Sequence, residues 1–248
     1  MDQDLTAQAH RLVAEYFPDA LAALLAGSAA AGRASASSDL DLAVLVAPGG
    51  ETYRETVRFE GRPAELFVHT EPGLAELFAF DAASRRAVLQ HMYADGVLLL
   101  DRAGAGARAR ARAAAELRQG PPVLGPQAVE AKRYALTDLL ADLPDAREPI
   151  ERLAVAGAVL DTAADLLCDH RRAWTGSGKW LPRRLLAADP QLGAALLEGH
   201  RRLCETHSPT PLADAATAVL DLVGGPLCAG YRRTWSGTGG PAHSAPRG

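Results

Sequence analysis

Apolar positions in the first part of the chain change from a helical to an alternating spacing. Residues 5–25 begin with a helical pattern, in which one face carries Leu5, Ala9, Leu12 and Val13. Pro18 interrupts this pattern, because proline cannot continue a helix without losing a backbone hydrogen bond. The apolar run LAALLAG (21–27) then predicts a short buried strand that ends in a turn at Gly27.

Four further strands are indicated before residue 102. SDLDLAVLV (38–46) is strand-like and stops at the breaker PGG (48–50). TYRETVRF (52–59) and RPAELFVH (62–69) lie on either side of Glu60-Gly61 and predict a β-hairpin. Helical periodicity resumes over 73–94, and GVLLLD (96–101) is expected to form another buried strand.

The second half of the chain is helical in pattern throughout. The segments with this pattern are 107–118, 127–143, 148–174, 183–188, 191–204 and 211–223. We therefore predict an α+β protein with a small mixed-sheet domain over 1–120 and an all-α helical-bundle domain over 121–235, divided near GPPVLGP. Residues 236–248 have almost nothing apolar to bury, so we expect a disordered tail.

Composition excludes several classes of protein. A hydrophobic content of 48% with 23% charged residues is ordinary for a globular protein, and the net charge of −4 gives no general attraction to nucleic acid or to anionic membranes. There is no apolar run of the about 20 residues that a membrane span needs, and the polar N-terminus is no secretory signal. The three cysteines lack CxxC spacing and are expected to be buried thiols in a reducing compartment, which predicts a cytoplasmic location.

The candidate chemistry begins with Asp39 and Asp41 in the strand 38–46. Alternate side chains of a strand share a face, so these two carboxylates are expected about 6–7 Å apart, with Leu40 and Leu42 directed into a core. Two adjacent carboxylates repel each other, and this cost needs an offset. A magnesium ion supplies it, because Mg²⁺ prefers oxygen ligands and leaves positions for water and phosphate.

Glu65 is the candidate for a third carboxylate. In the second hairpin strand, Glu65, Phe67 and His69 share one face, while Leu66 and Val68 share the other. If this strand lies beside the strand 38–46, Glu65 reaches the same ion; the spacing alone does not prove that adjacency. A pair of ions bridged by shared carboxylates could then assist an in-line phosphoryl displacement.

The loop before Asp39 fits a phosphate ligand. Gly27 and Ser28 are followed by small residues as far as Gly32, so the backbone there can approach a triphosphate closely. Ser38 immediately precedes Asp39, and we group it with them as a nucleotide-binding candidate. No Walker-type GxxxxGK[ST] is present, which argues against a P-loop enzyme.

Taken together, GS-x3-G-x5-SDLDL and the following h-E-h strand resemble the DNA polymerase β-type nucleotidyltransferase superfamily. Within it, the chain is most similar to the small antibiotic-modifying (aminoglycoside-type) and minimal nucleotidyltransferases. The resemblance covers about residues 20–70, and it implies nucleotide binding at Gly27 and Ser28 and metal binding at Asp39, Asp41 and Glu65. Many relatives carry an arginine where this chain has Ala29-Ala30-Ala31; Arg33 is the nearest substitute.

Two residues outside the motif are candidates for supporting roles. Asp138, in KRYALTDLLADL, is our candidate for the base that accepts the acceptor hydroxyl's proton, although a solvated helix carboxylate is an equally good interpretation. Lys179, in TGSGKWLPRR, follows two glycines and could contact phosphate, with Trp180 stacking on a base or packing against the protein; a surface loop is the alternative.

These features predict an enzyme that uses Mg²⁺, with two ions expected, and transfers a nucleoside monophosphate to a small hydroxyl-bearing acceptor. AMP from ATP is the first expectation, with another nucleoside triphosphate as the alternative co-substrate, and the resemblance makes an aminoglycoside-like antibiotic one acceptor to consider. The alternatives are nucleotidylation of a protein, as in antitoxins, and a non-catalytic nucleotide-binding module. A template-directed polymerase is disfavoured by the acidic net charge. A homodimer that completes the acceptor site is compatible with the sequence.

Overall fold

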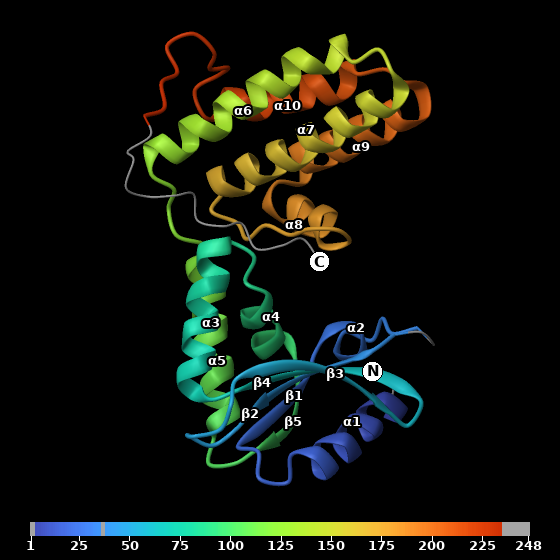
Figure 1. Cartoon of the computed structure of the whole chain (residues 1–248), viewed down its shortest axis with the longest axis vertical. Coiled ribbons are helices and arrows are strands. Elements are labelled where there is room, and N and C mark those ends of the chain that lie inside the picture. The colour runs from blue at the N-terminus through green and yellow to red at the C-terminus, as the bar shows by residue number, and fades with distance from the viewer. Residues whose placement is uncertain (1–2, 36–37, 235–248) are drawn as a thin grey trace. The chain divides into compact units, whose positions relative to one another are not determined.

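The structure is a computed structural model that describes residues 3–35 and 38–234 (Figure 1). The chain divides into two compact units. The first runs to Val123 and also includes Cys168–Asp189; the second consists of Leu124–Leu167 and the residues from Pro190 onward. The predicted tail 236–248 lies outside the described residues. Among the residues described, no helix has the length and apolar character needed to cross a bilayer.

A five-stranded mixed sheet forms the centre of the first unit within the described residues. Its strands are β1 (Ala22–Leu25), β2 (Leu40–Leu45), β3 (Tyr53–Phe59), β4 (Arg62–His69) and β5 (Val97–Asp101). They lie in the order β3-β4-β2-β1-β5, and β2 and β4 are parallel while the other neighbouring pairs are antiparallel. The predicted strands and the hairpin at Glu60-Gly61 are thereby confirmed, as is the α+β class.

Helices cover both faces of this sheet (Figure 1). α1 (Gln3–Tyr16) packs on one face through the apolar residues that its periodicity predicts, against a cluster that includes Leu40, Leu42 and Leu66. On the other face, Ala43 and Leu45 pack with residues of α3 (Glu71–Ser84), α4 (Val88–Asp95) and α5 (Ala105–Gln119). Because consecutive strand residues alternate between the two clusters, Asp41 and Glu65 lie on the α3–α5 side of the sheet.

The periodicity over 73–94 predicts one helix, but the structure contains two. The helix is interrupted at 85–87, where Arg85 and Ala87 adopt left-handed backbone conformations with φ of 62° and 52°. The Asp81 carboxylate accepts the Leu89 N–H at 2.7 Å and stabilises the start of α4. Residues 85–87 contain neither glycine nor proline, so the sequence gives no signal of this break. The strand predicted at 96–101 is also only half-buried, because β5 is at the edge of the sheet.

The remaining helices follow the predicted segments closely. They are the short α2 (Gly27–Ala30), then α6 (Pro126–Asp145), α7 (Pro149–His170), α8 (Trp180–Ala188), α9 (Pro190–Thr206) and α10 (Thr210–Leu222). The cysteine prediction is wrong for two of the three thiols. All three are free, but only Cys168 is buried, while Cys204 and Cys228 are exposed to solvent.

The segment 168–189 belongs to the first unit, although the sequence placed it in the helical domain. Asp169 forms a buried ion pair with Arg85, the residue that ends α3. The Thr175 N–H donates to the Arg85 carbonyl at 2.9 Å, and Trp174 Nε1 donates to the Leu117 carbonyl at 3.1 Å. These contacts hold the loop that carries Lys179 and the helix α8 against the first unit.

Candidate metal centre

The parallel pairing of β2 with β4 brings three carboxylates together. Asp41 is directly opposite Glu65 in the register, and Asp39 immediately precedes the first residue of β2. One carboxylate oxygen from each of Asp39, Asp41 and Glu65 lies within 4.8 Å of the other two. The strand adjacency that the sequence could not prove is therefore present, and we call these three residues the triad.

The electrostatics of Asp41 are unfavourable in the absence of a divalent cation. Burial, together with the charges of Asp39 and Glu65, raises the pKa of Asp41 from its usual value to about 6. The positive charges of Lys179 and Arg54 act in the opposite direction and lower that pKa. A carboxyl group held in this way gains from a divalent cation, because the ion favours the charged form.

Gly27 forms a close-fitting wall of the site. It follows β1, and the N–H of its neighbour Ala26 donates to the Asp41 carbonyl at 2.7 Å. Gly27 has a left-handed φ of +63°, and a Cβ atom built on it would overlap the Asp41 carboxylate. A side chain is therefore excluded on both conformational and steric grounds, and the backbone approaches the carboxylate directly.

The residues present fit a magnesium ion. Three carboxylate oxygens at mutual distances below 4.8 Å form a donor set of hard oxygen ligands. The glycine backbone beside Asp41 leaves room that any other residue would fill. Mg²⁺ uses only one or a few protein carboxylates and keeps its other positions for water and phosphate, which this half-exposed site allows.

Arg54 is a neighbour of the triad that the sequence analysis did not identify. It lies on β3, and its Nη2 donates to Glu65 Oε2 at 2.8 Å. Its guanidinium group also lies 4.8 Å from the centre of the Phe67 ring. In the hairpin register Arg54 is opposite Phe67, and Glu65, two residues before Phe67 on β4, is its diagonal neighbour. Counting outward from the Glu60-Gly61 turn would have revealed this relation.

The predicted nucleotide-binding residues Ser28, Arg33 and Ser38 differ from one another in exposure and in hydrogen bonding. Ser28 is half-buried in α2, and its carbonyl accepts the Arg33 N–H at 2.9 Å, while the Arg33 side chain is exposed. The Ser38 hydroxyl accepts the Ser35 N–H at 2.8 Å, so it stabilises the loop that leads into the triad. The cations whose charges act on Asp41 are Lys179 and Arg54.

Lys179 and Asp138 belong to different units of the structure. Lys179 is exposed at the start of α8 in the first unit, and its charge reaches Asp41. The neighbouring Trp180 ring has the guanidinium groups of Arg183 and Arg184 at 4.8 and 5.2 Å from its centre, so this ring packs with cations. Asp138 is exposed on α6 in the second unit.

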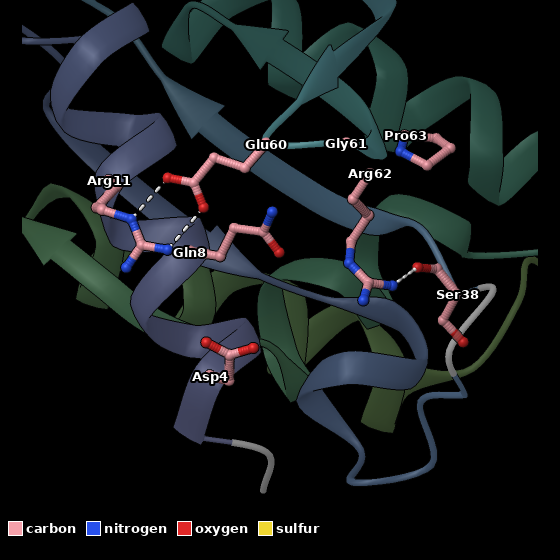
Figure 2. Close-up of a pocket in the computed structure, with 8 residues that line it drawn as sticks. All are labelled: Asp4, Gln8, Arg11, Ser38, Glu60, Gly61, Arg62 and Pro63. Carbon is pink, nitrogen blue, oxygen red and sulfur yellow. Dashed lines mark hydrogen bonds and ion pairs between the residues drawn. The ribbon is translucent and has the colours of Figure 1, made fainter.

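A cavity of about 330 Å³ lies between α1 and the turn of the β3–β4 hairpin (Figure 2). Arg11 and Glu60 form a bidentate ion pair across it, with Nη2 to Oε2 at 2.7 Å and Nε to Oε1 at 2.8 Å. Arg62 donates to the Ser38 carbonyl. None of its eight lining residues belongs to the triad. Its connection to the triad is Ser38, the residue before Asp39.

Comparison with known proteins does not identify the family of the chain. No protein-family model and no curated protein matches the chain. Among solved structures, a nucleotidyltransferase-like protein from Exiguobacterium sibiricum 255-15 is similar, with 12% identity over 88% of this chain and 74% of that one. The TM-score is 0.43, which is too low to carry an argument about function. The geometry of the triad must therefore support any assignment.

Proposed function

We propose that the protein is a magnesium-dependent nucleotidyltransferase that moves a nucleoside monophosphate, AMP from ATP in the first instance, to a hydroxyl of a small acceptor. The observation that carries the proposal is the convergence of Asp39, Asp41 and Glu65 from adjacent parallel strands against the backbone of Gly27. A cluster with this electrostatic cost is well suited to metal binding.

In the proposed reaction, the acceptor oxygen forms a bond to the α-phosphorus while the bond to the bridging oxygen of the β-phosphate breaks. Pyrophosphate leaves, and the hydroxyl proton passes to a base, for which Asp138 stays our sequence-based candidate. Asp39, Asp41 and Glu65 would hold the magnesium, for which we expect two ions. When bound, the ions would supply charge stabilisation for the phosphoryl oxygens.

The remaining residues of the site would bind and orient the triphosphate. The lack of a side chain at Gly27 lets the backbone of Gly27 and Ser28 approach phosphate oxygens. Lys179 already exerts its charge on the triad, so it is the best-supported cation for the phosphates. Roles for Arg33 and Ser38 in nucleotide binding stay predictions.

The test is an assay with labelled ATP, Mg²⁺ and a panel of polyhydroxylated acceptors that includes aminoglycosides, read by mass spectrometry. Wild-type protein should transfer AMP, while Asp41→Asn should lose activity by at least about a hundredfold and, without divalent ions, should melt at a temperature no lower than that of wild type. Glu55→Gln, which removes an exposed carboxylate from β3, is the matched control and should stay active.

Three outcomes would point elsewhere. Full activity in Asp41→Asn would refute the assignment. A gain in mass on a protein in place of a small acceptor would favour protein nucleotidylation. Nucleotide binding with no dependence on Mg²⁺ and no transfer would favour a non-catalytic module.

A further inference from the structure

Arg54 provides a positive charge at the side of the triad that Glu65 occupies. Its guanidinium group is 2.8 Å from Glu65 Oε2 and rests against the Phe67 ring at 4.8 Å. Both partners lie on β4, on the face of the sheet that carries the triad. The ion pair therefore occupies one of the carboxylates that the proposed metal would use.

The contacts of Arg54 are those of a cation that can be displaced. Its side chain is 61% exposed, while that of Glu65 is 25% exposed. An ion pair this open to water contributes little net free energy, because water and salt screen it. The aromatic ring gives the guanidinium a second contact near the triad, and this contact does not depend on the ion pair with Glu65.

A divalent ion and Arg54 cannot both use Glu65 at full strength. The ion needs one carboxylate oxygen of Glu65, and Arg54 draws on the negative charge of the same carboxylate through Oε2. The positive charges of the ion and of Arg54 would also repel each other. When the ion binds, either the guanidinium leaves Glu65, or Glu65 remains paired with Arg54 and is a weaker ligand for the ion.

We propose that Arg54 is a resident counter-cation of the triad: it pairs with Glu65 in the metal-free protein and gives way when a divalent ion binds, so that it lowers the affinity for the free ion. This inference rests on the proposed function, since it requires the triad to bind metal. Arg54 acts through Glu65 and is a positioning residue in this scheme. Its effect should be to disfavour metal occupancy before a nucleotide brings further charge.

The test is a titration of the full-length protein with Mn²⁺ alone, followed by electron paramagnetic resonance at fixed ionic strength and at a pH well above the pKa of Asp41. Arg54→Gln should bind Mn²⁺ about three- to tenfold more tightly than wild type, because it removes a competing charge. Arg58→Gln is the matched control. It removes the same charge from the same strand, where Arg58 donates to the Gly61 carbonyl at 3.1 Å, and it should leave the affinity unchanged.

A double-mutant cycle separates this specific ion pair from a general charge effect. In a Glu65→Gln background, Arg54→Gln should improve binding clearly less than it does in wild type, because only the longer-range effect of its charge on the rest of the triad remains. No gain in Arg54→Gln, an equal gain in Arg58→Gln, or a gain that is undiminished without the Glu65 charge would each overturn the proposal. If Asp41→Asn binds Mn²⁺ as well as wild type does, the metal site itself fails, and the Arg54 proposal fails with it. Loss of the Arg54 effect with intact Asp41-dependent binding leaves the proposed function standing.

Discussion

At the scale of single residues, Asp41 combines the features that define the site. It lies opposite Glu65, near Asp39, and against a glycine that cannot be replaced without overlap. The sequence could predict that Asp39 and Asp41 share a face, since this follows from strand alternation. It could not predict the Gly27 contact, because that depends on how β1 and β2 pair.

Replacing Gly27 with alanine should damage both stability and metal binding. The left-handed φ alone costs about 1 kcal/mol for a non-glycine residue. The new Cβ atom would also overlap the Asp41 carboxylate and force it to move. Gly49→Ala is the control, since Gly49 also has a positive φ but has open space around its missing Cβ. Denaturant unfolding should show a larger loss for Gly27→Ala, with weakened Mn²⁺ binding in that variant only. Equal losses in the two variants would contradict the packing that we describe.

The raised pKa of Asp41 predicts a pH-dependent difference between wild type and Asp41→Asn. The folded protein has a pKa of about 6 at this group, above the ordinary value of 3.8, so it binds the proton more tightly than the unfolded chain does. The resulting stability is present below about pH 4 and is lost as the pH rises to about 6. Without divalent ions, wild type should therefore lose roughly 1–3 kcal/mol relative to Asp41→Asn across this window.

This comparison isolates Asp41 from an opposing group. Burial lowers the pKa of His69 to about 4, so His69 destabilises the fold as the pH falls from its ordinary value. His69 is present in both proteins and cancels in the difference, which denaturant unfolding at several pH values can measure. A difference that stays constant from pH 4 to 7 would show that Asp41 is not perturbed.

At the scale of elements, the strands were predictable and their neighbours were not. Alternation in 62–69 placed Glu65 and Phe67 on one face, which the structure bears out. Parallel pairing of β2 with β4 arises from a crossover through β3, and local periodicity contains no information on such long-range pairing. Arg54 was missed for a related reason, because its role follows from the register of β3 on β4.

The buried ion pair between Arg85 and Asp169 should be essential for anchoring the segment that carries Lys179. Their side chains are only 11% and 7% exposed, so Asp169→Asn leaves a buried guanidinium without its charged partner. We expect a loss of about 3 kcal/mol in unfolding free energy and faster proteolytic cleavage of residues 171–179. Glu60→Gln, which breaks the exposed pair with Arg11, should leave the melting temperature close to that of wild type. Comparable destabilisation in the two variants would contradict this account.

At the scale of the whole molecule, composition and periodicity predicted a sheet-containing part followed by a helical part. They did not predict that 168–189 returns to the first unit, because its helical pattern resembles that of its neighbours. Buried contacts at Arg85 and Leu117 decide where this segment lies, and such contacts leave no periodic signal. The return matters for function, since it brings the charge of Lys179 to bear on Asp41.

In the proposed enzyme, three carboxylates of one sheet hold divalent ions against a triphosphate. The most direct test of this arrangement is a crystal structure of the wild-type protein with Mn²⁺ and a non-hydrolysable ATP analogue, in which anomalous scattering locates the metal. We predict a peak about 2 Å from carboxylate oxygens of Asp39, Asp41 and Glu65, with the phosphates adjoining it. Bound nucleotide with no metal at these three side chains, or metal held elsewhere, would contradict the account.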